Sequence, residues 1–317
     1  MKDIEHYISE LDWTMPPRNL YEPIQYIMLQ GGKRIRPALC LLAADLFGGN
    51  GEQAIYPAIA FELLHNFTLL HDDIMDNASL RRGKETVYKK WNANIAILSG
   101  DTLFAKSYEY LLGYQGKGLA DLLSLLTKTA IEICEGQQMD LDFEDKKEVE
   151  IAQYLTMIRL KTAVMLAACL KAGAIVSSAS EQEQQLIYDF GIKTGLAFQI
   201  QDDLLDVYAD ATKFGKNTGG DIAENKKTFM SLKAMELAEK DDLERLYFYF
   251  SSTHFDREEK LIAVKSIYDK YKVKAEAHLL INQYYKEAVE ILHQLNAPQI
   301  PKQTLIDFVD KLINRER

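Results

Sequence analysis

The chain of 317 residues contains no proline between Ala58 and Ala297, although it has seven prolines in all. Because proline interrupts helices, a long stretch without it favours consecutive helices. Within this stretch the segments 119–136, 181–210 and 264–295 repeat apolar residues every three to four positions, and a glycine at 136 is predicted to end the first of them. No segment shows the alternation of residues that is typical of a strand, and the loops are too short to separate domains. The sequence therefore predicts an all-α fold in a single domain over residues 1–317.

Cysteine is also scarce, and long apolar runs are absent. Cys40, Cys134 and Cys169 lie far apart and match no metal-binding spacing, so we expect reduced, buried thiols. The longest apolar stretch, 163–176, is interrupted by Lys171 and is too short to span a bilayer. The first residues lack the basic and apolar regions of a signal peptide. These features predict a soluble cytoplasmic protein with no stable membrane insertion.

Basic residues are outnumbered by acidic ones, 37 against 47, which gives a formal net charge of −10. This balance argues against a nucleic-acid-binding protein, which usually carries a basic stripe. It does not argue against small anionic ligands, because these respond to local rather than total charge. The placement of the charges is therefore more informative than their sum.

Carboxylates form two similar clusters, HDDIMD at 71–76 and QDDLLD at 201–206. On a helix, Asp72 and Asp76 lie one turn apart on one face, as do Asp202 and Asp206. Like charges at this spacing destabilise a helix by a few tenths of a kcal/mol, so their recurrence suggests a shared counter-ion. Oxygen ligands without His or Cys favour Mg²⁺, and two facing pairs predict a diphosphate held through it. The alternative is two acidic helix faces with no joint role.

Cations gather near these clusters. The segment GGKRIRP, 31–37, combines three cations with a glycine pair that allows close backbone approach to an anion. Arginine side chains match the geometry of phosphate oxygens. The other cations near the acidic motifs are Arg81, Arg82, Lys161, Lys216 and Lys226. Together these residues predict a protein that holds two phosphorylated ligands.

The order of these motifs resembles that of the trans-polyprenyl diphosphate synthases, of the short-chain farnesyl or geranylgeranyl diphosphate synthase type. The resemblance rests on GGKRIRP, HDDIMD followed by RRG, EGQQMD, KTA, FQIQDDLLD and GK…DIxxxK, and runs from Gly31 to about Thr228. It implies a bundle of ten or more helices around a central cavity. It also implies a homodimer, three Mg²⁺ ions per site, and isopentenyl diphosphate and an allylic diphosphate as substrates.

The resemblance also implies a role for each motif residue. The main Mg²⁺ ligands would be Asp72, Asp76 and Asp202, with Asp73 and Asp206 supporting. The diphosphate of isopentenyl diphosphate would be held by Lys33, Arg36, His65 and Arg82. The allylic diphosphate would be contacted by Arg81, Lys161, Lys216 and Lys226. Thr162 and Gln199 would lie along the reacting carbons, with Gln137 and Asp140 in the same inner layer.

The implied reaction is the head-to-tail condensation of isopentenyl diphosphate with a C5–C15 allylic diphosphate to give all-trans products. No motif residue is an obvious general base, and the family assigns that task to the departing diphosphate. The large Phe67 and the small Thr68, five and four residues before Asp72, resemble the short-chain enzymes. They predict C15 to C20 products, with C20 favoured.

Three alternatives stay open. The chain could be a farnesyl diphosphate synthase only. It could be a terpene cyclase, although cyclases usually carry an Asn/Ser/Glu-type second motif instead of DDLLD. It could be an inactive regulatory subunit, although such a subunit would be expected to lose aspartates or cations.

One departure from many bacterial relatives is Asn225 in place of a glycine before Lys226. Because Asn also permits a left-handed backbone, we expect phosphate binding to be retained.

Overall fold

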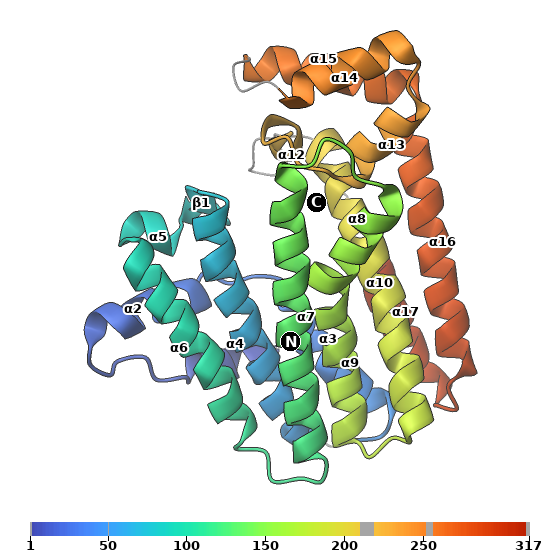
Figure 1. Ribbon diagram of the computed structural model, residues 1–317. Coiled ribbons are helices and arrows are strands. Elements are labelled where there is room, and N and C mark those ends of the chain that lie inside the picture. Colours follow the sequence, from blue (N-terminus) through green and yellow to red (C-terminus); the bar gives the residue numbers. More distant parts are fainter. Residues whose placement is uncertain (1, 50, 210–218, 252–255, 315–317) are drawn as a thin grey trace. The chain divides into compact units, whose positions relative to one another are not determined.

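The computed structural model describes residues 2–49, 51–209, 219–251 and 256–314 (Figure 1). Lys216, a predicted ligand of the allylic diphosphate, lies outside these ranges. Helices dominate, and the described residues contain more than ten of them. The only strands among the described residues are β1 (Leu80–Arg81) and β2 (Lys84–Glu85), which form an antiparallel hairpin that the sequence pattern did not predict. The all-α prediction is confirmed.

The chain divides by its contacts into two compact units, each built from three separate stretches of sequence. Unit 1 comprises Met1–Ala130, Ala168–Tyr188 and Leu295–Leu305. Unit 2 comprises Ile131–Ala167, Asp189–Gln294 and Ile306–Arg317. The single domain and the central cavity stay predictions.

Unit 1 is organised around helix α4, which carries the first aspartate cluster. α4 packs along α6 and also contacts α3 (Figure 1). Its fully buried residues include Phe61, Leu64 and Leu70, so the helix is apolar around most of its surface before the aspartates begin. The helices that lie wholly in unit 1 are α1 (Lys2–Ser9), α2 (Arg18–Met28), α3 (Ile35–Leu46), α4 (Gly51–Met75), α5 (Val87–Lys90) and α6 (Ala93–Leu111).

Unit 2 carries the KTA motif on η1 (Arg159–Ala163), a single π-helical turn. Around it, α13 contacts α8, α15 and α16, and α15 contacts α12 and α14. The helices that lie wholly in unit 2 are α8 (Ile151–Ile158), α12 (Gly220–Ala223), α13 (Phe229–Leu237), α14 (Lys240–Ser251), α15 (Arg257–Lys270) and α16 (Val273–Gln294). The remaining helices are α7 (Leu119–Glu144), α9 (Val164–Val176), α10 (Glu181–Tyr208) and α17 (Gln299–Ile313).

One prediction of a helix boundary is wrong. Gly136 does not end a helix, because α7 continues through it to Glu144. The range 264–295 is helical as its apolar spacing predicted, in two helices, because α15 ends at Lys270 and α16 begins at Val273. Lys272, between them, has a φ of 55°, a left-handed conformation that ends a helix.

The cysteines agree with the prediction in part. All three cysteines are free, and Cys40 and Cys169 are buried as predicted. Cys134 is exposed on α7, so the prediction of a buried thiol is wrong for this residue. In the part of the chain that the structure describes, no helix combines the length and apolarity needed to cross a membrane.

Candidate active site

The first aspartate cluster lies at the C-terminal end of α4. The helix ends at Met75, and the backbone N–H of Asp76 still donates to the carbonyl of Asp72 at 2.8 Å. The two side chains are both half-buried and lie one turn apart, as predicted. Asp73 between them is only 1% exposed. The cluster therefore presents two accessible carboxylates and one buried carboxylate.

Asp73 is paired with Arg81 of the hairpin. The Nε and Nη2 atoms of Arg81 lie 2.8 Å and 2.7 Å from Oδ1 of Asp73. Burial raises the pKa of Asp73, and the hydrogen bond from Arg81 acts against this shift. The other carboxylate oxygen, Oδ2, is buried without a hydrogen-bond partner among the described residues. Arg81, a predicted diphosphate ligand, thus also neutralises a buried carboxylate.

Arg82 lies in the two-residue turn of the hairpin. Arg82 and Gly83 have φ values of 53° and 75°, the left-handed pair that a type I′ turn requires. The Arg82 guanidinium donates to the carbonyl of Gly31. A Cβ on Gly32 would lie 3.0 Å from the Cζ atom of Arg82. In this structure the Arg82 guanidinium lies close to the Gly31–Gly32 pair. Binding of an anion at this pair stays a prediction.

The GGKRIRP segment is anchored by Arg34, for which no role was predicted. Arg34 precedes α3 with a φ of 43° and is 6% exposed. Its Nη1 lies 2.6 Å from the Glu62 carboxylate of α4, and its Nε lies 3.0 Å from Glu5. Lys33 on one side is exposed, and Arg36 on the other is half-buried. The buried ion pair therefore holds the backbone between two predicted diphosphate ligands.

His65 lies on α4 among arginines. Burial lowers its pKa well below the usual value, and the positive charges of Arg36 and Arg82 lower it further. The imidazole is therefore neutral at neutral pH and can donate one hydrogen bond without adding charge. The structure places His65, Arg36 and Arg82, all predicted for the same diphosphate, close enough to interact electrostatically.

Phe67 belongs to a row of rings that crosses from α4 to α6. Its ring centroid lies 4.7 Å from that of His71 and 5.2 Å from that of Phe104 on α6. Thr68 is half-buried, and its hydroxyl donates to the carbonyl of His65 at 2.8 Å. The phenyl ring is thus held between neighbours from two helices, whereas the threonine side chain turns back onto its own helix.

In unit 2, two glycines let neighbouring helices approach η1 closely. A Cβ on Gly136 of α7 would lie 2.4 Å from the backbone nitrogen of Lys161. A Cβ on Gly195 of α10 would lie 2.4 Å from Cα of Ala163. Only glycine permits such contacts, and isolated π-helical turns are frequent at functional sites. The side chains one turn later on both helices are consequently brought to the motif.

The side chains of Asp140 on α7 and Gln199 on α10 form hydrogen bonds with the KTA motif. Oδ2 of Asp140 accepts a hydrogen bond from Nζ of Lys161 at 2.6 Å. Oε1 of Gln199 accepts one from the Thr162 hydroxyl at 2.9 Å. Gln137, predicted in the same layer, is buried. The structure therefore brings the KTA motif together with the predicted residues of α7 and α10.

Asp203 fixes the orientation of Gln199, although no role was predicted for it. Oδ1 of Asp203 accepts from Nε2 of Gln199 at 3.1 Å. Oδ2 accepts from the hydroxyl of Tyr154 and from the backbone N–H of Phe229, the latter at 3.1 Å. Asp203 is 4% exposed, and this burial raises its pKa to about 6. Its position inside the DDLLD motif was the only sequence signal for it.

The two predicted metal ligands of the second cluster both lie on α10. Asp202 and Asp206 are both half-buried. The Asp206 carboxylate accepts the first N–H groups of α12, from Gly220 at 3.2 Å and Asp221 at 3.0 Å. Because this cluster belongs to unit 2 and the first to unit 1, the predicted facing of the two clusters stays a prediction.

Within the described ranges, no three or more His, Cys, Asp or Glu side chains form a group that could hold a metal ion. Mg²⁺ does not require such a group, because it keeps several waters and usually takes one or two carboxylates with phosphate oxygens. Asp72 and Asp76 supply two half-buried carboxylates. The donor set therefore fits Mg²⁺ bound together with a diphosphate.

A small cavity of about 130 Å³ lies in unit 2 at η1. Lys226, a predicted diphosphate ligand from the segment after α12, reaches the same cavity as the KTA motif. Its lining includes Asp140, Lys161, Thr162, Gln199, Asp203 and Lys226. Predicted site residues from four separate stretches of sequence therefore line the same cavity.

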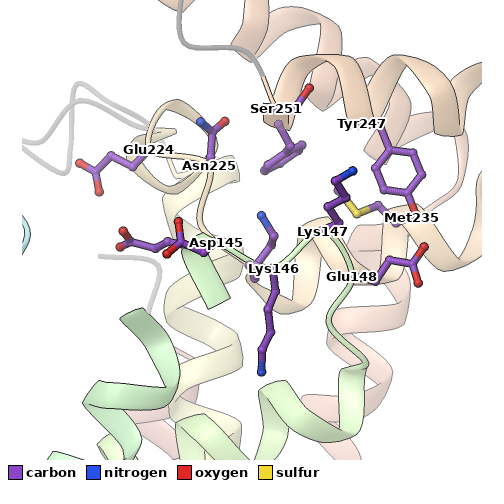
Figure 2. Close-up of a pocket in the computed structure, with 12 residues that line it drawn as sticks. Asp145, Lys146, Lys147, Glu148, Glu224, Asn225, Met235, Tyr247 and Ser251 are labelled. Carbon is purple, nitrogen blue, oxygen red and sulfur yellow. The ribbon is translucent and has the colours of Figure 1, made fainter. Parts of the chain in front are cut away.

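A larger cavity of about 720 Å³ also lies in unit 2 (Figure 2). Figure 2 shows Lys146 and Lys147 on the loop after α7, Asn225 after α12, and Tyr247 on α14. Carboxylates and lysines both line this cavity, so it lacks the single sign of charge expected of a diphosphate site.

Comparison with known proteins identifies the family. Residues 17–270 match the polyprenyl synthetase family. The chain is 38% identical over 314 residues to a short chain isoprenyl diphosphate synthase of Methanothermobacter thermautotrophicus, covering 98% of this chain and 94% of that protein. It is 37% identical over 303 residues to a geranylgeranyl diphosphate synthase of Sulfolobus acidocaldarius, covering 94% and 91%.

A solved geranylgeranyl pyrophosphate synthase structure has the same fold, with a TM-score of 0.93 and 40% identity over 100% of this chain and 96% of that one. The ordered motifs, the all-α fold and these matches lead to one conclusion. The chain belongs to the polyprenyl synthetase family.

Proposed function

We propose that the chain is a short-chain trans-prenyltransferase that condenses isopentenyl diphosphate with a C5–C15 allylic diphosphate, head to tail. The observation that carries this proposal is the arrangement at η1. There a lysine, a threonine hydroxyl and a glutamine amide from separate motifs line one small cavity. The relatives named as geranylgeranyl and short chain isoprenyl diphosphate synthases support the same reaction.

The two diphosphates would be held by different sets of cations. His65, Arg36 and Arg82, with Lys33, would bind isopentenyl diphosphate, and the concentration of positive charge around His65 favours an anion there. Lys161 and Lys226 line the cavity at η1 and would bind the allylic diphosphate. Arg81 and Lys216 are proposed for the same allylic group.

Mg²⁺ would be held by Asp72, Asp76 and Asp202, with Asp73 and Asp206 supporting. We propose three ions per site. When bound, Mg²⁺ supplies positive charge to the diphosphate oxygens and so favours loss of the diphosphate from the allylic carbon. The half-buried Asp72 and Asp76, one turn apart, support this assignment.

The direction of the hydrogen bonds at η1 gives Thr162 a defined task. Its hydrogen is donated to Gln199, so its oxygen keeps free lone pairs. Lone pairs fixed near a developing allylic cation stabilise that cation without forming a bond to it. Lys161 would neutralise negative charge on the departing diphosphate, which then accepts the proton lost from the condensed product.

Product length would be set by the ring row at Phe67. A phenyl ring supported by Phe104 would block a growing prenyl chain, and we propose C20 products in preference to C15. A homodimer is also proposed, on the family resemblance alone.

The proposal is tested by incubating the protein with Mg²⁺, labelled isopentenyl diphosphate and each allylic starter in turn, and sizing the products. C20 diphosphate is expected, with activity lost in a chelator and restored by Mg²⁺. Exclusive C15 product would indicate a farnesyl diphosphate synthase, and cyclic hydrocarbon a terpene cyclase. Absence of incorporation with every starter would refute the synthase and favour the regulatory subunit.

A matched pair of variants ties the activity to the site. Thr162→Val keeps the side-chain shape and removes the hydroxyl at η1. Thr156→Val makes the same change on α8, where the hydroxyl is exposed and binds only its own helix. We expect kcat to fall by roughly tenfold or more for the first variant and to stay unchanged for the second.

A further inference from the structure

Lys226 follows a left-handed turn that ends α12. The N–H of Asn225 donates to the carbonyl of Ile222 at 3.3 Å, and the N–H of Lys226 donates to the carbonyl of Asp221 at 2.9 Å. These two bonds form a Schellman motif, with Asn225 as the left-handed residue at a φ of 62°. The turn at Asn225 therefore holds the backbone of Lys226 on its N-terminal side, while the carbonyl of Lys226 accepts from the Ser231 hydroxyl at 3.2 Å.

Only glycine adopts this conformation without a steric penalty, and Asn is among the few other residues that tolerate it. Here the Asn225 side chain has a specific partner. Its Oδ1 accepts a hydrogen bond from Nζ of Lys260, which lies 35 residues later on α15. The turn before Lys226 is thus attached to a different helix through one side-chain contact.

Lys260 is 4% exposed, and its Nζ lies 5.4 Å from the centroid of the Phe250 ring on α14. Burying an ammonium group costs free energy, which one neutral acceptor and one aromatic ring offset only in part. A methionine of similar length would fill this space without that cost. The contact with Asn225 is therefore the feature that a lysine provides and an apolar residue does not.

Asn225 and the residue after it line two different cavities. Asn225 and Phe250 line the larger one, where Figure 2 shows Asn225 on the segment after α12 and Ser251 on α14. Lys226, the next residue along the chain, lines the small cavity at η1. A displacement of Asn225 would consequently reach the side chain proposed to bind the allylic diphosphate.

We propose that Lys260 is a positioning residue that acts through Asn225 to hold Lys226 at the allylic diphosphate. The proposal rests on the proposed function, in which Lys226 binds this diphosphate. Lys260 itself touches neither substrate. Its removal changes diphosphate affinity only because the left-handed turn at Asn225 loses its anchor.

The test combines Lys260→Met with substitutions of Asn225. Affinity for inorganic diphosphate with Mg²⁺ is measured by calorimetry, and kcat and KM are measured for both substrates. We expect Lys260→Met to weaken diphosphate binding by about tenfold and to raise KM for the allylic substrate, with KM for isopentenyl diphosphate unchanged. In the Asn225→Gly background the same change should alter affinity less than about twofold, because glycine needs no anchor.

Two further variants separate positioning from general destabilisation. Asn225→Ala removes the acceptor but keeps a Cβ at positive φ, so it should lose affinity as Lys260→Met does, whereas Asn225→Gly should not. In a Lys226→Met protein, Lys260→Met should cause no additional loss. Equal affinity of Lys260→Met and wild type would overturn the proposal, as would failure of Asn225→Gly to suppress its effect. Because calorimetry requires no turnover, these outcomes are independent of whether the wild-type protein elongates prenyl chains.

Discussion

The hydroxyl of Thr162 donates to the amide oxygen of Gln199 at 2.9 Å, and this direction is set from the other end of the amide. The nitrogen of Gln199 donates to Asp203 at 3.1 Å. An ionised carboxylate only accepts hydrogen bonds, so the glutamine must present its N–H₂ group to Asp203 and its oxygen to Thr162. The buried carboxylate thereby determines that the Thr162 oxygen keeps its lone pairs free.

Asp203→Asn should therefore impair catalysis more than binding. An asparagine carries both a donor and an acceptor, so it no longer forces one orientation on Gln199. We expect kcat to fall by about tenfold to a hundredfold with little change in KM for either substrate. Steady-state kinetics above pH 7 measure this, where Asp203, with its pKa raised by burial to about 6, is ionised in the wild type.

Tyr154→Phe is the matched control for this prediction. It removes a hydrogen bond to Oδ2 of Asp203 and leaves Oδ1 facing Gln199. We expect a loss of about 1–2 kcal/mol in the free energy of unfolding and a kcat within a fewfold of wild type. A full kcat in Asp203→Asn, or equal losses in both variants, would contradict the orienting role.

Phe67→Ala should lengthen the products by one or more C5 units. The phenyl ring packs against Phe104 across two helices, so its removal opens space that a small side chain cannot fill. Product sizing after incubation with an allylic starter measures the effect. Leu63→Ala, one turn earlier on α4 and 1% exposed, creates a cavity outside the ring row and should leave product length unchanged. Unaltered products from Phe67→Ala would reject the ring row as the limit on chain length.

Arg34→Met should destabilise the protein strongly. It leaves the Glu62 carboxylate, 2% exposed, without the guanidinium 2.6 Å away. Breaking one side of a buried pair costs about 3–5 kcal/mol, because the remaining charge is uncompensated. Urea denaturation at neutral pH measures this loss. The double variant Arg34→Met with Glu62→Leu should recover most of it, and a double variant as unstable as the single one would argue against this cause.

Lys260 should make stability depend on pH above neutrality. Burial, with the positive charge of Lys227, lowers its pKa from 10.5 to about 8. Its direct contacts, Asn225 and Phe250, are uncharged. Because the unfolded chain holds this proton up to a higher pH, unfolding takes up a proton between pH 8 and 10.5. Above about pH 10.5 the Lys260 amine is neutral in both states, so its burial does not lower the free energy of unfolding. As the pH falls from 10.5 to about 8 the free energy of unfolding decreases, because the unfolded chain binds the proton more readily.

Lys260→Met removes this titration and serves as the reference. The free energy of unfolding of the wild type, minus that of the variant, should rise by up to about 3 kcal/mol from pH 8 to 10.5. Urea denaturation at several pH values measures the difference, in which groups shared by both proteins cancel. A difference that is constant with pH would show that Lys260 has an ordinary pKa.

The helical fold could be predicted because its signals are local. The absence of proline over 58–297 and the three- to four-residue apolar period act within single segments, and α10 (Glu181–Tyr208) follows the predicted range closely. Gly136 was misassigned because a glycine that ends a helix and one that admits a neighbour look alike in sequence. The distinction lies in Lys161, whose backbone leaves no room for a Cβ at residue 136.

The identities of most site residues could be predicted as well, because the motifs keep their order along the chain. The contacts that these residues make could not be predicted. Asp206 was predicted as a metal ligand, and its carboxylate also binds the first N–H groups of α12, 14 and 15 residues later. No pattern within the DDLLD motif contains that information, since the partner is a backbone segment with its own fold.

By itself, the sequence determined that this chain is helical, that its acidic and basic motifs suit two diphosphates, and which family it resembles. These properties depend on residue type and on spacing within one turn or one motif. Only the tertiary structure decided that Asp203 orients Gln199, that Arg34 anchors the basic segment, and that Lys260 holds the turn before Lys226. Each of these contacts joins separate helices or segments, and such a contact exists only after packing has brought its two partners together.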